Sequence, residues 1–154
     1  MRLRAVIFDD EPAMRHVLWM LCDRRGYEVF TFPTPALCPL YAMHRCPCPP
    51  GTVCADLLLS DLNMPEVQGL DFVEGLLAKA CVAPHIALMS AAWSEAARAR
   101  AVRLGCRLFT KPFSSAEILA WFDTVESQVE STRALLDWRG QGWRVDPPAP
   151  EERL

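Results

Sequence analysis

Carboxylates, a hydroxyl and an ammonium group follow four separate apolar runs of the chain. Asp9 and Asp10 come directly after the run that ends at residue 8, and Asp61 follows a run of leucines. Ser90 and Lys111 close two further runs in the same way. Short apolar runs that end at polar residues are typical of buried strands, and functional groups gather at the carboxyl ends of parallel strands. We therefore expect these five side chains at one edge of a sheet.

This set of groups suits phosphoryl chemistry. Clustered carboxylates repel one another and need a cation, and hard oxygen ligands favour Mg²⁺, which also bridges to phosphate. An aspartate can attack phosphorus and form an aspartyl phosphate, and a metal ion, a lysine and a hydroxyl can stabilise the transferred oxygens. Lys111 is one of only two lysines beside 14 arginines, which favours a defined task for its compact charge.

Five alternations of strand and helix would position these groups. Apolar runs predict strands over residues 3–8, 27–32, 55–60, 85–89 and 107–110. Periodic apolar positions and capping residues predict helices over 12–25, 35–44, 70–77, 95–104 and after Ser114, which forms a capping box with Glu117. The alternation predicts an α/β fold, a doubly wound five-stranded parallel sheet with helices on both faces, of the flavodoxin-like (βα)5 type.

Length and composition exclude several classes of protein. The 154 residues fit one domain, and a hydrophobic share of 51% is enough for a core, which argues against a disordered chain. A net charge of −3 gives no general attraction to nucleic acid or to anionic membranes. The apolar stretches are too short to span a bilayer, and no apolar signal segment precedes Asp9. We expect a cytoplasmic protein with no nucleic-acid or membrane partner.

Four motifs, in order along the chain, resemble those of a known family. They are Asp9-Asp10-Glu11, Ser60-Asp61-Leu62-Asn63-Met64-Pro65 with Gly69, Leu88-Met89-Ser90-Ala91, and Lys111-Pro112-Phe113. With these motifs, residues 2 to about 128 resemble the receiver domain of two-component response regulators. The resemblance implies a stand-alone receiver, a phosphoprotein that takes its phosphoryl group from a sensor histidine kinase or a phosphotransfer protein.

The resemblance also assigns a phosphoacceptor and a metal site. Asp61 would be the phosphoacceptor. Asp9, Asp10 and Asp61, together with the backbone carbonyl of Asn63, would bind Mg²⁺ as the cofactor. Such a receiver promotes its own phosphorylation and dephosphorylation and is not a multiple-turnover enzyme.

Two further residues would respond to the phosphoryl group. Ser90 and Lys111 would contact its oxygens, and the Lys111–Pro112 peptide bond would be cis, as in the family. Ser90 would also act in the switch that changes the surface of the fourth helix, fifth strand and last helix. Receivers place an aromatic residue three positions before the lysine, where this chain has Leu108, so Phe109 is the candidate switch aromatic in a shifted register. The signal would pass to an unidentified downstream protein or to a homodimer formed through the last helix.

A segment rich in cysteine and proline, at about residues 38–54, is longer than the usual connection in receivers. It holds Cys38, Cys46, Cys48 and Cys54, with His44 among them. Thiols at this density could hold Zn²⁺, although the spacing is not that of paired zinc motifs. Three interpretations stay open: a proline-stiffened loop with reduced thiols, a metal site, and a redox site. The remaining cysteines are expected in or near the core, namely Cys22, Cys81 and Cys106.

The end of the chain is too poor in periodic apolar residues for an output domain. We expect a receiver domain over residues 1–130 and a helical extension with a flexible tail over 131–154, with no output domain.

Two other functions are compatible with the sequence. One is a phosphohydrolase of the haloacid dehalogenase type, although such enzymes space their acids as D-x-D whereas Asp9 and Asp10 are adjacent. The other is a non-phosphorylated interaction module in which the cysteine-rich segment carries a metal or redox activity.

Overall fold

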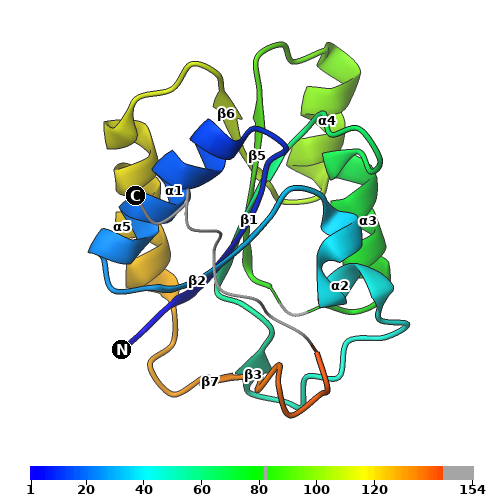
Figure 1. The fold of residues 1–154 in the computed structure, drawn as a ribbon, viewed down its shortest axis with the longest axis vertical. Coiled ribbons are helices and arrows are strands. Elements are labelled where there is room, and N and C mark those ends of the chain that lie inside the picture. The colour runs from blue at the N-terminus through cyan, green and yellow to red at the C-terminus, as the bar shows by residue number, and fades with distance from the viewer. Residues whose placement is uncertain (82, 144–154) are drawn as a thin grey trace.

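Five parallel strands form the central sheet of the computed structural model, which describes residues 1–81 and 83–143 (Figure 1). The strands are β1 (Arg4–Phe8), β2 (Glu28–Phe32), β4 (Leu57–Asp61), β5 (His85–Ser90) and β6 (Arg107–Thr110). Their spatial order is β2-β1-β4-β5-β6, and every pairing is parallel. The doubly wound parallel sheet predicted from the sequence is therefore confirmed.

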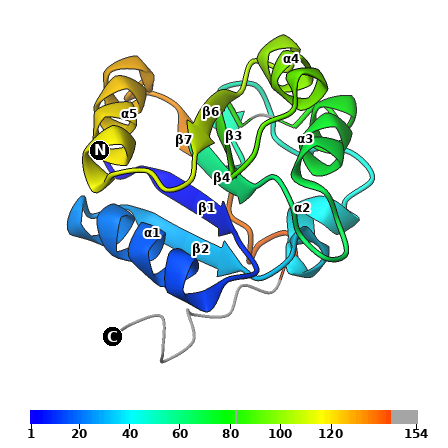
Figure 2. The same cartoon turned by 90° about the horizontal axis from the view of Figure 1, so that it is seen from above.

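Helices cover both faces of this sheet (Figure 2). One face carries α1 and α5 and the other carries α3 and α4, with the bounds α1 (Pro12–Arg24), α3 (Gly69–Ala78), α4 (Glu95–Arg103) and α5 (Ser115–Gln128). Along β1, Val6 and Phe8 are buried on the α3 side, whereas Ala5 and Ile7 are buried on the side of α1 and α5. Burial on both faces explains why the strands are continuous apolar runs. Among the described residues, no helix has the length and apolar character needed to cross a membrane.

The helix predicted over residues 35–44 is interrupted. A 3-10 turn, η1 (Pro35–Leu37), is followed by a single helical turn, α2 (Pro39–Ala42). Cys38 and Met43, which flank α2, both have extended backbone. Pro39 lacks an N–H and fits the first turn of a helix, so it starts α2 and ends the preceding turn. Because α2 is so short, Tyr41 remains 43% exposed beside α3.

A second, two-stranded sheet joins distant parts of the chain. β3 (Thr52–Val53) pairs in parallel with β7 (Ala134–Leu135). The helical extension predicted for residues 131–154 is therefore wrong over the described residues 131–143. The physical reason is that Val129 has extended backbone at the end of α5, and the chain then runs beside the proline-rich segment. The flexible tail predicted beyond Pro147 lies outside the described residues.

Buried charges hold this C-terminal segment to the amino end of the sheet. Arg133 donates to both carboxylate oxygens of Asp56, at 2.7 and 2.6 Å. Asp56 is only 1% exposed and also accepts the backbone N–H of Arg4 at 2.8 Å. The carboxylate thus joins β1, the start of β4 and the segment that follows α5.

Two further side chains complete this attachment. The guanidinium of Arg4 donates to the carbonyls of Cys54 and Leu136, at 3.0 and 2.7 Å. The indole N–H of Trp138 donates to the same Cys54 carbonyl at 3.0 Å, and its ring packs 4.7 Å from that of Phe30. Residues 133–138 are therefore part of the folded domain and not an appendage to it.

Candidate functional site

Three carboxylates lie together at the carboxyl edge of the sheet. Asp9 and Asp10 follow β1, and Asp61 is the last residue of β4, which pairs with β1. One carboxylate oxygen from each lies within 4.8 Å of the others. Asp9 is fully buried and Asp61 is nearly so, whereas Asp10 is exposed. This acidic cluster (Asp9, Asp10 and Asp61) therefore reaches solvent through Asp10.

Lys111 neutralises part of the acidic cluster. Its Nζ donates to Oδ2 of Asp9 at 3.0 Å and lies 3.6 Å from Oδ1 of Asp61. The other oxygen of Asp9 accepts the backbone N–H of Glu11 at 2.9 Å. The Lys111–Pro112 peptide bond is cis, as the resemblance to receivers implied. The ammonium thus bridges the two buried carboxylates.

Burial shifts the titration of all three buried groups. It raises the pKa of Asp9 above the ordinary value of 3.8 and outweighs the hydrogen bonds from Glu11 and Lys111. Burial and the charge of Asp9 likewise raise the pKa of Asp61. Burial lowers the pKa of Lys111, but the hydrogen bond and charge of Asp9 and the charge of Asp61 outweigh it, so this pKa is raised. The cluster holds more negative charge than one ammonium balances, and a bound cation would relieve it.

The loop after β4 fixes the carboxylate of Asp61. The backbone N–H of Asn63 donates to that carboxylate, which lowers the pKa of Asp61 against the effect of burial. Gly69, the first residue of α3, packs so closely on the strand that an added Cβ would lie 2.4 Å from the backbone oxygen of Asp61. Its own N–H donates to the carbonyl of Leu62 at 2.9 Å. The absence of a side chain at residue 69 therefore lets α3 begin against the end of β4.

Ser90 ends β5 beside Lys111, whose backbone N–H donates to the Ser90 carbonyl at 2.8 Å. The Ser90 hydroxyl donates to the carbonyl of Ala92 at 2.9 Å and accepts the N–H of the same residue at 3.2 Å. It is turned toward its own loop and would have to rotate to bind a phosphoryl oxygen. Trp93, in this loop, donates its indole N–H to the carbonyl of Phe109 at 3.0 Å and so joins the loop to β6.

Phe109 lies on the face of the sheet that carries α5. It is 2% exposed, and its ring packs against those of Trp121 and Phe113, with centroids 5.9 and 5.8 Å apart. Leu108, at the position where receivers have an aromatic residue, packs on the α4 side together with Trp93. A switch at Phe109 would therefore act through α5, and its assignment stays a prediction. Trp93 is an aromatic side chain on the α4 side, close to the loop of Ser90.

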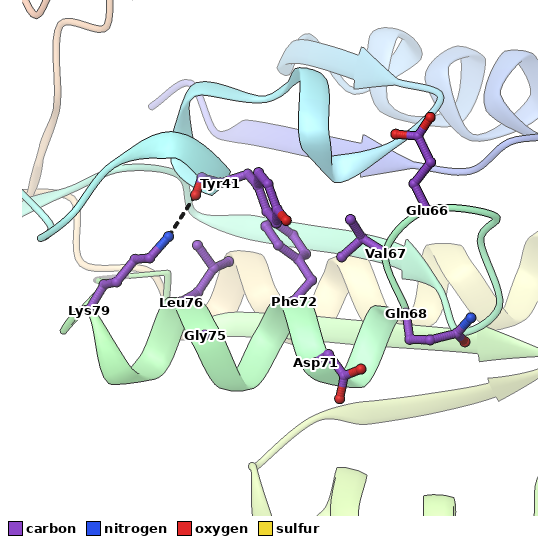
Figure 3. A pocket seen from close by; sticks show the side chains of 9 residues that line it. All are labelled: Tyr41, Glu66, Val67, Gln68, Asp71, Phe72, Gly75, Leu76 and Lys79. Carbon is purple, nitrogen blue, oxygen red and sulfur yellow. Dashed lines mark hydrogen bonds between the residues drawn. The ribbon is translucent and has the colours of Figure 1, made fainter.

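A surface groove lies between α2 and α3 (Figure 3). It has a volume of about 340 Å³ and is lined by Tyr41, Glu66, Val67, Gln68, Asp71, Phe72, Gly75, Leu76 and Lys79. The short α2 leaves this space open, and Nζ of Lys79 donates to the Tyr41 carbonyl at 2.7 Å across one end of it. No member of the acidic cluster lines the groove, so the candidate chemistry of Asp61 lies outside it.

The cysteines of the proline-rich segment lie in two environments. The sulfur atoms of Cys46, Cys48 and Cys54 lie within 4.8 Å of one another. Cys38 is 1% exposed, and its backbone carbonyl accepts the N–H of Tyr41 at 3.0 Å at the start of α2. None of the seven cysteines, all within the described residues, forms a disulfide bond. The metal or redox role proposed for this segment therefore concerns three of its four cysteines.

Comparison with known proteins identifies the family of this chain. A model of the response regulator receiver domain matches residues 5–123. A probable transcriptional regulatory protein of Picosynechococcus sp. is 31% identical over 120 residues, which cover 77% of this chain and 47% of that protein. The transcriptional regulatory protein KdpE of Mycobacterium tuberculosis is 28% identical over 116 residues, which cover 75% of this chain and 47% of that protein. The chain spans about half the length of these curated relatives.

Solved structures share the fold. The chemotaxis protein CheY4 of Vibrio cholerae matches with a TM-score of 0.65 and 21% identity, over 81% of this chain and 99% of that one. The non-phosphorylated HemR receiver domain of Leptospira biflexa matches with a TM-score of 0.68 and 21% identity, over 84% of this chain and 98% of that one. The match to the receiver model favours a signalling domain over the haloacid dehalogenase alternative. Together with the strand order, it shows that this chain belongs to the response regulator receiver domains, the signalling domains of two-component systems.

Proposed function

We propose that Asp61 accepts a phosphoryl group from the phosphohistidine of a sensor histidine kinase or a phosphotransfer protein. A carboxylate oxygen of Asp61 forms the new P–O bond while the P–N bond to the imidazole breaks, and the released imidazole nitrogen takes a proton from solvent. The product is an aspartyl phosphate. The observation that best supports this proposal is the position of Lys111, whose Nζ lies 3.6 Å from Oδ1 of Asp61 and is held by Asp9 at 3.0 Å. An ammonium there would meet the charge of an arriving phosphoryl group.

The donor set of the acidic cluster fits Mg²⁺. The carboxylate oxygens of Asp9, Asp10 and Asp61 are hard ligands within 4.8 Å of one another, and Asp10 is exposed, so water can complete the coordination that Mg²⁺ prefers. These groups and the backbone carbonyl of Asn63 would hold the ion. When bound, Mg²⁺ would neutralise part of the charge on the phosphoryl oxygens.

Two residues near Asp61 would bind the other phosphoryl oxygens. Lys111 would pair with one phosphoryl oxygen, and the Ser90 hydroxyl would rotate away from Ala92 to donate to another. Phosphorylation adds about −1.5 to −2 charge and three strong acceptor oxygens, which supplies the force for that movement. Because Trp93 joins the loop of Ser90 to β6, the movement would reach the surface formed by α4, β6 and α5. A partner protein, as yet unidentified, would bind the altered surface.

Phosphoryl labelling tests this proposal. The purified chain is incubated with Mg²⁺ and a radiolabelled acyl phosphate or phosphorylated histidine kinase, and the hydroxylamine-sensitive label is counted. We expect Asp61→Asn to remove the label and Asp23→Asn, which changes an exposed acid on α1, to retain it. Full labelling of the Asp61→Asn variant would refute the assignment, and multiple turnover on small phosphomonoesters would favour a phosphohydrolase.

A further inference from the structure

Four thiols meet at the amino end of β4, away from the acidic cluster. Cys46 and Cys48 come from the proline-rich segment, Cys54 precedes β4 by three residues, and Cys81 follows α3. The sulfur of Cys54 lies 3.4 Å from that of Cys46 and 3.0 Å from that of Cys48. The sulfur atoms of Cys46, Cys48 and Cys54 lie within 4.8 Å of one another. The thiol of Cys81, just after the end of α3, interacts with that of Cys54.

We propose that Cys46, Cys48, Cys54 and Cys81 bind one Zn²⁺ through four thiolates. Structural zinc sites are tetrahedral and commonly use four cysteines. With Zn–S bonds of about 2.3 Å, the sulfur atoms of a tetrahedral site lie about 3.8 Å apart, so small outward movements of the sulfurs would admit the ion. This site has a different ligand set from the one suggested by sequence proximity, because Cys81 takes the place of Cys38.

The spacing of the sulfurs favours a metal over a disulfide. A disulfide uses two sulfur atoms at about 2.05 Å, and it would leave the other two thiols unused beside it. Cys54 contacts Cys46 and Cys48 at once, at comparable distances, and interacts with Cys81 as well. Three sulfur atoms that all lie within 4.8 Å of one another can serve as ligands of one shared ion, with Cys81 beside them as the fourth.

Backbone hydrogen bonds hold three of the four ligands in place before any ion arrives. The N–H of Cys46 donates to the carbonyl of Lys79 at 2.9 Å, which joins the proline-rich segment to the end of α3. Ala80 has a left-handed backbone conformation, φ 58°, and Cys81 donates its N–H to Leu76 at 3.0 Å. The carbonyl of Cys54 accepts the hydrogen bonds from Arg4 and Trp138 described above. A site fixed in this way loses little conformational entropy when it binds a metal.

All four proposed ligands are at least partly buried. The side chains of Cys46, Cys48 and Cys81 are partly buried against the core on the α3 side, and Cys54 is fully buried. Binding deprotonates four thiols, so four protons leave for one Zn²⁺ and the site gains a net charge of −2. Lys79 and Arg45, each two residues or fewer from a ligand, bring positive charge to the same region.

The proposed site is structural and independent of phosphoryl transfer. Cys54 precedes β4 and Asp61 is the last residue of that strand, so the strand alone separates them by about 13 Å. The zinc would join three segments, namely the proline-rich segment, the start of β4 and the end of α3. Its loss would loosen the lower end of the molecule in Figure 1, where β3 and β7 lie, and leave the acidic cluster in place.

Metal analysis of the full, untagged chain tests this inference. The protein is purified under reducing conditions, and zinc and iron are measured by mass spectrometry. We expect about one Zn²⁺ per chain. Replacement of the zinc by Co²⁺ should give the absorption of tetrahedral cobalt with thiolate ligands, a readout that needs no variant. Iron in place of zinc, less than about one metal ion in ten chains, or a chain lighter by two hydrogens from a disulfide would each overturn the proposal.

A matched pair of variants identifies the fourth ligand. We expect Cys81→Ala to lower zinc retention in a chelator about tenfold or more, whereas Cys106→Ala, which removes a buried thiol outside the cluster, should retain zinc like the unchanged protein. Equal retention by both variants would remove Cys81 from the site. Labelling of Asp61 is measured on the same samples. A chain that binds zinc but is not phosphorylated would refute the proposed function alone, and a chain that is phosphorylated without zinc would refute this inference alone.

Discussion

The ion pair of Arg133 and Asp56 gives a quantitative prediction about stability. Substitution of Arg133 by methionine keeps the length of the side chain but removes both hydrogen bonds to Asp56, at 2.7 and 2.6 Å. The side chain of Arg133 is 11% exposed and that of Asp56 is 1% exposed, so the ion pair is largely removed from water. The substitution leaves a carboxylate buried without its cation.

The expected loss follows from that burial. Removal of one partner of a buried ion pair costs about 3–5 kcal/mol. Asp56 retains the hydrogen bond from the backbone N–H of Arg4 at 2.8 Å, so we expect the lower end, about 3 kcal/mol. For a domain of this length, that free energy corresponds to a fall in Tm of about 6–12 °C.

Urea and thermal unfolding, followed by circular dichroism, measure this loss. A second variant, Asp56→Asn with Arg133→Met, removes both charges and keeps an oxygen for the Arg4 N–H, so it should be more stable than the single Arg133→Met variant. The control is Arg100→Met, because Arg100 pairs with Asp71 and Glu74 at the surface and its loss should have little effect. The reasoning is refuted if Arg133→Met unfolds like the Arg100→Met control, or if the double variant is the least stable of the three.

Three further predictions concern the phosphoryl site. Gly69→Ala should push α3 away from the Asp61 carbonyl and lower both Tm and the labelling rate, and an unchanged rate would show that the loop tolerates the shift. The raised pKa of Asp9 means that the folded state favours the protonated acid, so without metal its contribution to stability is present below pH 3.8 and is lost as the pH rises through the raised pKa. Mg²⁺ binds the ionised carboxylates, so the increase in Tm on adding Mg²⁺ should be absent at about pH 3.5 and grow toward about pH 7. An increase that does not depend on pH would contradict this. A phosphoryl mimic should change the tryptophan fluorescence, and Trp93→Phe should remove most of that change because it breaks the hydrogen bond to the Phe109 carbonyl. An equal change in the variant would exclude Trp93 as a reporter.

The part of the fold that sequence could predict is the part where local pattern and final position agree. Asp9, Asp61, Ser90 and Lys111 could be placed together because each ends or follows a short apolar run. Strands β1, β4 and β5 are buried and show as such runs, and β6 is a more exposed edge strand. The capping box of α5 was equally visible, since Ser114 and Glu117 are only three residues apart. Local signals of this kind need no knowledge of the rest of the chain.

The parts that sequence missed depend on contacts between distant residues. β3 and β7 have two residues each, too few to show any periodicity. Arg133 and Asp56 are 77 positions apart, and neither residue marks the other as its partner. Cys81 packs against the core as predicted, but its interaction with Cys54 could not be predicted because 27 positions separate the two residues. The switch role of Phe109 stays a prediction. Its ring lies on the α5 side of the sheet, which its position in the sequence did not indicate by itself.

The attachment of residues 133–138 changes where this receiver can be cut. The family model ends at residue 123, inside α5, and a chimera designed from that match would discard everything beyond it. Such a cut removes three partners: the Leu136 carbonyl that accepts from Arg4, the Arg133 guanidinium that pairs with Asp56, and the Trp138 ring that packs on Phe30. A chimera should therefore be joined after residue 138, so that these contacts are kept. A receiver cut at residue 123 would lack them.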